Sequence, residues 1–447
     1  MTLGEIDGQR AVADRVLRER PITRRLPNHT ISDLLISVST AIDLAEGRAT
    51  GHAQRVAFIA MSLAGAMGLD GSLKLACCYA GLLHDIGVVT AGSRLTDHVY
   101  GDERQIFASL PLLSPEEAAF TASDEPSIVV EHLIEHTIHG SLFGQELEMP
   151  VEAVKGIAAH HENWDGSGYP HGLAGEEIPV VGRIVALADH IESMISQTSA
   201  LQARRNFPYW LAPLIGSLAD PQAVQALRML SSGDMFWLGL FSLSLGTELS
   251  AACSRLREPK APRIHTFMER FSYLIDSRFV FTMGISAKVA RLSEALGHAA
   301  GLTDSRLRLL RLAALLHDVG QLCVSERIMA KPGILSVDEL DILRMHPQYS
   351  SEIVAGIPGL EEAALWVASH HERTDGRGYP EGLSGEAIPL ESRILAVADT
   401  FVAMISDRPH RPRIDVPDAI RRLRSAAGTQ LDPDLVELFI ERVAVYQ

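Results

Sequence analysis

Histidine and aspartate side chains recur along this 447-residue chain in an order that suits metal binding. In the first half the candidates are His52, His84, Asp85, His136, His160, His161 and Asp189. Imidazole nitrogens and carboxylates suit Fe, Mn, Zn or Ni, and one shared carboxylate can bridge two ions. Any one of these histidines alone would more often be an ordinary core or surface residue. Five histidines and two aspartates in one order therefore indicate a metal site.

The second half repeats this order, which indicates a second candidate site. Its members are His317, Asp318, His346, His370, His371 and Asp399. The adjacent His-Asp pair recurs after 233 residues, whereas the later histidines and the last aspartate recur after 210 residues. The first copy therefore carries about 23 extra residues, most simply within 91–125.

The two adjacent histidines of each copy open the same motif, 160–170 in the first half and 370–380 in the second. Its Asp-Gly-x-Gly-Tyr-Pro run predicts a tight turn, because glycine tolerates positive φ and proline fixes its own φ. Trp164 within this motif could stack on a base or pack on its own domain. Glu162 and Glu372 could orient the neighbouring histidines or be solvated.

The segments that must position these residues have helical spacing. Leu34, Leu35, Val38 and Ile42 recur at intervals of three and four residues, and further helices are expected from about His52, over 73–83, 128–138, 151–159 and 178–194. No series of strands is evident, so the predicted fold class is all-α with two tandem helical domains. The predicted boundaries are an N-terminal arm 1–30, a first domain 31–232, a helical connector 233–275 and a second domain 276–447.

Composition narrows the class of partner and the compartment. The formal charge of −16 argues against binding a nucleic-acid polymer or an anionic membrane. Four cysteines are too few for a disulfide framework, the N-terminus lacks the apolar stretch of a signal peptide, and 235–245 is too short to span a bilayer. We therefore expect a cytoplasmic protein without membrane association.

These motifs resemble the HD-GYP family, a branch of the HD-domain phosphohydrolases. The resemblance rests on 83–87, His136, the motif from His160 to Pro170, and Asp189, and it recurs in the second half. It implies HD-type helical bundles around a centre of two or three metal ions, with Fe or Mn favoured. It also implies hydrolysis of cyclic di-GMP or a related cyclic dinucleotide.

The resemblance assigns roles to single residues. His52, His84, Asp85 and Asp189 would hold one divalent ion, and Asp85, His136, His160 and His161 would hold a second. His84 and Asp85 would be catalytic, and Trp164, Tyr169, Arg408 and Arg411 are candidates for substrate binding. Arg48 replaces the glutamate of a third-metal site, so we expect two ions.

The chain also departs from the family pattern. Val88 and Gln321 replace a lysine that would meet the scissile phosphate, and Ile285 replaces the second copy of His52. We therefore expect a cyclic-dinucleotide phosphodiesterase whose first domain is catalytic and whose second is regulatory. The alternatives are a signalling scaffold or nucleotide sensor without turnover, and an enzyme for another nucleotide or phosphomonoester. A homo-oligomer or a signalling-protein partner would be compatible with each of them.

Overall fold

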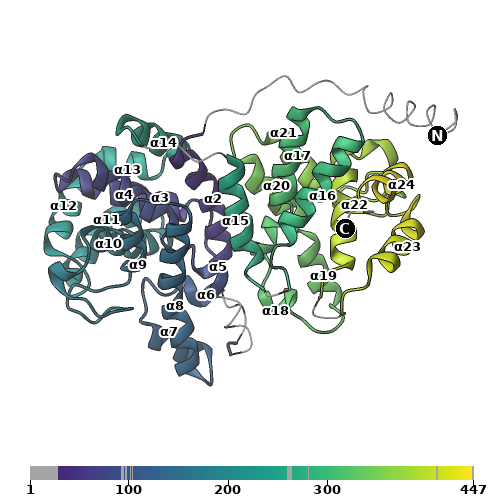
Figure 1. The fold of residues 1–447 in the computed structure, drawn as a ribbon. Helices are drawn as coiled ribbons and strands as arrows, with labels where there is room; N and C mark the ends of the chain where they lie inside the picture. Colours follow the sequence, from purple (N-terminus) through teal and green to yellow (C-terminus); the bar gives the residue numbers. More distant parts are fainter. Residues whose placement is uncertain are drawn as a thin grey trace, which may run out of the picture. The chain divides into compact units, whose positions relative to one another are not determined.

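The structure, a computed structural model, describes residues 29–91, 95, 98–100, 102, 104–258, 264–279, 281–408 and 411–444. Within these ranges the regular elements are all helices, and the few β-bridges are isolated (Figure 1). The predicted all-α fold class is therefore confirmed. Of the predicted N-terminal arm, 1–28 lies outside the described residues.

The chain divides into two compact units. The first unit comprises His29–Ile264 with Ser325–Arg327, and the second comprises His265–Val324 with Ile328–Gln447. The helices of the predicted connector 233–275 are divided between these units. Helices α13 (Asp234–Leu240) and α14 (Leu245–Arg255) pack on α3 of the first unit, whereas α15 (Ile264–Asp276) falls almost entirely within the second.

The core of the first unit is a bundle of amphipathic helices that bury one face each. They are α2 (Ile31–Ala45), α3 (His52–Ala66), α4 (Gly71–Leu83), α8 (Pro126–Glu146), α9 (Val151–Ala158) and α10 (Val180–Ser196). The predicted apolar residues of α2, from Leu34 to Ile42, are at most 1% exposed. Helices α3 and α4 approach closely because Gly81 has no side chain, and a Cβ there would lie 2.7 Å from Ala57 Cα. This contact brings the beginning of α3 beside the end of α4.

Short helices precede α8 in the described part of the chain between 88 and 125. They are α5 (Val88–Ala91), α6 (Arg104–Phe107) and α7 (Pro115–Ala122). Ser114 and Glu117 form a capping box at the start of α7, and Ser336 and Glu339 form the same box at the start of α19 (Val337–Arg344). Helix α8 begins at Pro126, well before His136, whereas α20 (His346–Ala355) begins at His346 itself. Part of the extra length of the first copy therefore lies in α8, outside the interval 91–125.

One arginine–aspartate ion pair recurs at the same place in both units. Arg183 of α10 bonds Asp220 at 2.9 Å, and Arg393 of α22 (Leu390–Met404) bonds Asp432 at 2.7 Å. Asp220 also caps α12 (Pro221–Ser231), and Asp432 caps α24 (Pro433–Arg442). Each aspartate therefore begins one helix and ties it to another.

The remaining helices follow in the same order in both units. The first unit adds α11 (Ala200–Leu211) and the 3₁₀ turns η2 (Gly175–Glu177) and η3 (Ala212–Leu214), and the second unit adds α16 (Ile285–Ala299), α17 (Asp304–Leu316), η4 (Val319–Cys323), α21 (Glu361–Ala368), η5 (Gly385–Ala387) and α23 (Val416–Ala426). Helix α18 (Glu326–Met329) begins in the short segment that groups with the first unit.

One apolar stretch, Gly71–Ala91, has the length and hydropathy of a membrane span, but 83% of its most apolar part is buried within the structure. Such burial is typical of a core helix. Helices α13 and α14 pass the same test only as a pair, which is bent by 111°. The four cysteines are free thiols, of which Cys77, Cys78 and Cys253 are buried.

Candidate metal centre

Five segments of the first unit bring the seven predicted ligands together. His52 is the first residue of α3, His84 and Asp85 follow α4, and His136 lies in α8. His160 and His161 follow α9, and Asp189 lies in α10. All of them except His161, which is half-buried, are at most 4% exposed. A buried cluster of this kind requires that its charges be paired or that it hold ions.

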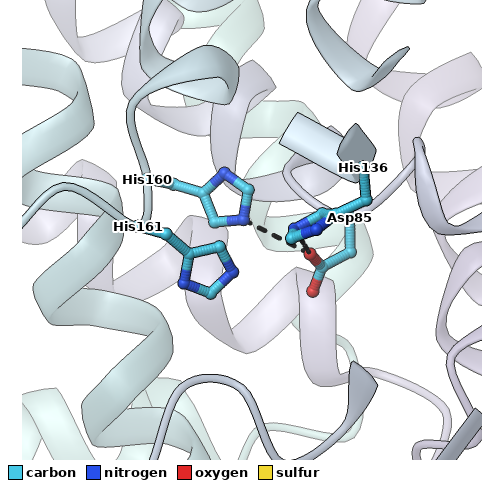
Figure 2. Close-up of side chains that lie close together, drawn as sticks. All are labelled: Asp85, His136, His160 and His161. Atoms are coloured by element: carbon cyan, nitrogen blue, oxygen red, sulfur yellow. Dashed lines mark ion pairs between the residues drawn. The ribbon is translucent and has the colours of Figure 1, made fainter. Parts of the chain in front are cut away.

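Asp85 lies at the centre of the cluster and faces histidines on two sides. Its Oδ1 atom lies 3.4 Å from His136 Nε2 and 3.3 Å from His160 Nε2, and Figure 2 shows both imidazoles directed toward it. Its Oδ2 atom lies 3.0 Å from His84 Nε2. The two oxygens of one carboxylate thus face different histidines, which is the arrangement that a bridging ligand requires.

Two groups of ligand atoms share Asp85. One group is Asp85, His136, His160 and His161, and the other is His52, His84 and Asp85, with the atoms of each group within 4.8 Å of one another. Asp189 extends the second group, because its Oδ1 lies 3.3 Å from His52 Nε2 and 3.7 Å from His84 Nε2. The structure therefore brings together all seven residues that the sequence singled out.

The hydrogen bonds of the imidazoles leave one nitrogen of each ring free for an ion. His84 and His160 donate Nδ1–H to the carbonyls of Gly81 and Ile157, at 3.0 and 2.7 Å, and His136 donates to the carbonyl of Leu133. A carbonyl can only accept, so Nδ1 carries the hydrogen and the Nε2 lone pair faces the cluster. These Nε2 atoms are buried and have no hydrogen-bond partner in the structure. This donor set fits divalent metal ions.

The local charges favour ligand forms of Asp85, His160 and His161. Burial would raise the pKa of Asp85, but the imidazoles of His84, His136 and His160 around its carboxylate hold that pKa well below its usual range. Burial lowers the pKa of His160 and His161, so both rings stay neutral near pH 7. A neutral imidazole and an ionised carboxylate are the forms that bind metal.

The two-histidine motif folds as the predicted tight turn. Gly166 has φ +83°, and a Cβ on Gly168 would lie 2.2 Å from the amide nitrogen of Asn163. The turn places the Tyr169 ring on the His161 ring, with centroids 4.7 Å apart and planes 19° apart. The Tyr169 hydroxyl is buried without a hydrogen-bond partner in the structure and lines the cavity described below. Tyr169 is therefore placed to meet a ligand.

The contacts of this motif correct the expectation for Glu162 and favour one of the two alternatives for Trp164. Glu162 is 1% exposed and accepts hydrogen bonds from the amides of His171 and Leu173, at 2.8 and 2.9 Å. It therefore holds the backbone of the turn and does not lie in solvent, and Glu372 likewise accepts from the amide of Glu381. Trp164 lies under the guanidinium of Arg183, 5.6 Å from the ring centroid, which favours packing within its own unit.

The sequence did not reveal Glu192 and Glu46, two buried glutamates near the ligands. Glu192 is fully buried, bonds His52 Nδ1 and accepts from Arg55 Nε at 2.6 Å. Burial lowers the pKa of His52, but the negative charge of Glu192 outweighs it and raises that pKa to about 9. Glu192 lies three residues after Asp189, nearly one helical turn, so that spacing was the signal that could have identified it.

Arg48 and Glu46 form the other buried ion pair of this region. Arg48 also donates to Ser193 Oγ at 2.8 Å and to the carbonyl of Ala108 at 3.2 Å. Burial would raise the pKa of Asp189, but the imidazoles of His52 and His84 and the charge of Arg48 hold that pKa well below its usual range. The guanidinium is therefore part of the electrostatic surroundings of the ligands.

A cavity of about 210 Å³ opens onto the cluster. Its inner end is formed by His160, His161 and Asp189. One side is formed by 110–116, the segment that leads into α7, and another by the turn residues Asn163 to Tyr169. Among the described residues that line it, none is lysine or arginine.

The second unit assembles a related but smaller set. His346 Nε2 lies 3.2 Å from Asp318 Oδ1, and His370 Nε2 lies 3.9 Å from the same oxygen. The ligand atoms of His346, His370 and His371 fall within 4.8 Å of one another. His317 Nε2 approaches Asp318 at 3.3 Å and Asp399 at 3.7 Å. The side chains of Asp318 and Asp399 are 22% and 16% exposed, more than the side chains of Asp85 and Asp189 at 6% and 2%.

The position of His52 is occupied by Ile285 in the second unit, as the sequence predicts. Ile285 begins α16 and is 4% exposed. At the same offsets Phe279, Phe281 and Val402 replace Glu46, Arg48 and Glu192. The two phenylalanine rings stack with centroids 5.0 Å apart. The second unit therefore has apolar side chains where the first has buried charges.

The two predicted substrate-binding arginines lie in the second unit. Arg408 lines a narrow hollow beside Ile285 and Asp318. Arg411 donates to the carbonyl of Ala403 at 2.6 Å, so its guanidinium is committed to the backbone. The residues between them, 409 and 410, lie outside the described ranges. Neither arginine is part of the cavity in the first unit.

Comparisons with known proteins agree with this geometry. A family model described as HD domain matches residues 120–207 and 269–435. The chain is 27% identical to the 3'3'-cGAMP-specific phosphodiesterase 3 of Vibrio cholerae, covering 90% of this chain and 92% of that protein. It is 36% identical to the cyclic di-GMP phosphodiesterase response regulator RpfG of Xanthomonas campestris, over 44% of this chain and 52% of that protein.

One solved structure shares the fold over nearly the whole chain. It is a crystal structure of a cyclic GMP-AMP specific phosphodiesterase of Vibrio cholerae, V-cGAP3, with a TM-score of 0.65 and 24% sequence identity. The alignment covers 94% of this chain and 98% of that chain.

Proposed function

Because the chain belongs to the HD domain family, we propose that it is a metal-dependent phosphodiesterase of the HD-GYP type. Its substrate would be a cyclic dinucleotide such as cyclic di-GMP or 3'3'-cGAMP, the molecules named for its relatives. The observation that carries the proposal is the convergence of five histidines and two aspartates at the end of a cavity. The cytoplasmic location and a homo-oligomer or signalling partner stay predictions.

The proposed ligand sets follow the two groups that share Asp85. His52, His84, Asp85 and Asp189 would hold one divalent ion, and Asp85, His136, His160 and His161 the other. Ions bound there, Fe or Mn in our proposal, would supply Lewis acidity and a nucleophile at neutral pH for attack on the phosphodiester. Glu192 would hold the His52 ring in its ligating orientation through Nδ1.

The protein's own contribution is to orient the substrate and exclude water. The Tyr169 hydroxyl is free to bond a substrate oxygen, and the ring beneath it is fixed by His161. The side formed by 110–116 is mostly apolar, which suits a flat base. Val88 is 3% exposed and packs in the core, so it offers the substrate no charge.

We propose that the first unit is catalytic and the second regulatory. The basis is the complete ligand set of the first unit and the loss of one ligand at Ile285. A signalling scaffold or nucleotide sensor without turnover is the second candidate, and one observation favours it. Val88 replaces the lysine of the family pattern, and the described lining of the cavity holds no other lysine or arginine that could neutralise a phosphate.

Activity measurements on the full chain test these candidates. The chain purified with Fe(II) or Mn(II) should hydrolyse cyclic di-GMP or 3'3'-cGAMP, and His84→Ala or Asp85→Ala should abolish turnover. Absence of hydrolysis together with dinucleotide binding by calorimetry would support the sensor. Turnover that survives both substitutions would contradict the proposed site.

A further inference from the structure

The cavity of the first unit has two chemically different ends. The inner end carries the metal-ligand residues His160, His161 and Asp189, which suit the phosphate of the proposed substrate. Another part of the lining is the segment 110–116, which is apolar except for Ser114 and Glu116. We call this segment the wall. A cavity that holds both a phosphate-binding end and an apolar side matches the polarity of a nucleotide.

The start of the wall is fixed relative to the ligands by contacts at and just before it. His190, next to Asp189, donates Nδ1–H to the carbonyl of Pro111 at 2.6 Å. Arg48 donates to the carbonyl of Ala108 just before the wall, at 3.2 Å. The Phe107 ring packs edge-on against His136, with centroids 5.8 Å apart. The wall therefore begins at a defined place beside the ligands.

Glu116 is the carboxylate that the wall contributes, and the fold does not use it. It lines the cavity and is exposed, whereas its neighbour Glu117 caps α7 by bonding Ser114. Among the described residues of the lining, the other carboxylate is Asp189 at the inner end. The charge of Glu116 also reaches Tyr169, where it adds to burial and to Asp85 and Asp189 in raising the pKa of the hydroxyl.

A carboxylate in a pocket for an anion cannot serve the phosphates, which it repels. It can serve a base edge that carries N–H donors. Guanine offers two neighbouring donors, N1–H and N2–H, which match the two oxygens of a carboxylate. Adenine offers one amino group beside the acceptor N1, and that acceptor would face a carboxylate oxygen.

We propose that Glu116 selects a guanine-bearing substrate by accepting the N1–H and N2–H of a base that lies against the wall. This inference rests on the proposed phosphodiesterase function and names the base it reads. Both cyclic di-GMP and 3'3'-cGAMP carry guanine, whereas cyclic di-AMP does not. Glu116 is therefore a specificity-determining residue, separate from the ligands that carry out the reaction.

Substitution of the carboxylate by its amide tests the proposal. The amide can both donate and accept a hydrogen bond, so it can pair with adenine, whereas the carboxylate can only accept. In Glu116→Gln the side chain accepts from the adenine amino group and donates to N1. We expect the ratio of kcat/KM for cyclic di-GMP over cyclic di-AMP to fall by about tenfold or more, the value of one bidentate base contact. Calorimetric binding to the metal-free chain should show the same shift in preference.

The matched control is Glu131→Gln, at an exposed position on α8 outside the cavity lining. Its substrate ratio should equal that of the unsubstituted chain. Metal content and Tm of Glu116→Gln should be unchanged, which separates loss of selectivity from loss of structure. Glu116→Asp should retain a preference for guanine.

The outcomes separate this inference from the proposed function. If the unsubstituted chain hydrolyses no cyclic dinucleotide, the phosphodiesterase proposal fails and this inference with it. If it hydrolyses cyclic di-GMP and Glu116→Gln keeps the same guanine preference, the inference is overturned and the function stands. A shifted ratio in Glu116→Gln with an unshifted ratio in Glu131→Gln supports the inference.

Discussion

The two units differ around one lost ligand, and the change extends beyond that ligand. In the first unit His52 is buried with Glu192 on its Nδ1 atom and the Glu46–Arg48 ion pair nearby. In the second unit, the corresponding positions are Ile285, Val402, Phe279 and Phe281. Buried charges are costly without partners, so the loss of the ligand removes the reason to keep them. The two units therefore differ both at one ligand position and at the charged residues that surround it.

The other side of each site has been kept. His136 Nε2 lies 3.4 Å from Asp85 in the first unit, and His346 Nε2 lies 3.2 Å from Asp318 in the second. His160 and His370 both donate Nδ1–H to the carbonyl three residues earlier, at 2.7 and 2.6 Å. The second unit therefore shares the surroundings of one proposed ion site with the first and differs from it at the other.

The largest expected effect comes from the shared aspartates. Asp85→Asn should lower kcat by more than the roughly 10–100-fold that loss of an outer partner of a metal ligand costs, because Asp85 faces both groups. Asp318→Asn should leave the kcat of the first unit within a few-fold. Steady-state hydrolysis of cyclic di-GMP by the two full-length variants measures this. Equal losses in both variants would mean that the two units share the catalysis.

Exchange of the differing ligand gives the next largest effect. His52→Ile should remove one ion per chain and lower activity about a hundredfold, because that site keeps too few ligands. Ile285→His should add no ion, since Phe279, Phe281 and Val402 offer its Nδ1 atom no acceptor. Metal content by atomic absorption checks both variants. An ion gained by Ile285→His would show that the lost histidine alone separates the units.

Removal of the charge on Glu192 should have a smaller effect. Glu192→Gln keeps the shape but weakens the hold on His52, so metal affinity should fall about 10–100-fold. Competition with a chromophoric chelator measures this affinity. The control is the position in the second unit, where Val402→Ala should leave the affinity of the first unit unchanged. An unaltered affinity in Glu192→Gln would show that His52 is oriented without it.

The smallest difference between the units is expected at a glycine that both retain. A Cβ on Gly87 would lie 1.9 Å from the His136 carbonyl oxygen, and one on Gly320 would lie 2.2 Å from the His346 carbonyl oxygen. Gly87→Ala and Gly320→Ala should each lower stability by about 1–3 kcal/mol through overpacking. Thermal unfolding of the metal-free full chain measures both. A loss in only one variant would show that the backbones of the two sites differ.

Much of the fold and the site could be predicted from the sequence, because the signals for them lie in the order and spacing of residues along the chain. The helical spacing of Leu34 to Ile42, and the repeated order of the seven ligands, are properties of neighbouring residues that survive without tertiary information. The resemblance then supplied the expected ligand sets. The structure brings those ligands together, as expected.

What the sequence did not reveal depends on contacts between distant segments. Glu192 acts on His52, 140 residues earlier, and Arg48 joins Ser193 to the carbonyl of Ala108. Glu162 was expected beside a histidine or in solvent, and its bonds to backbone amides arise only once the turn has closed. Helix α8 begins earlier than 128 because its first turns pack on α7, a contact that its own periodicity does not contain.

Metal content resolved by position tests the central claim most directly. Anomalous scattering from crystals of the full chain, grown with Fe or Mn, would locate each ion and assign it to a unit. The account predicts two ions in the first unit, one on either side of Asp85, and at most one in the second, beside His346, His370 and His371. A first unit without ions, or two ions in the second unit, would contradict it.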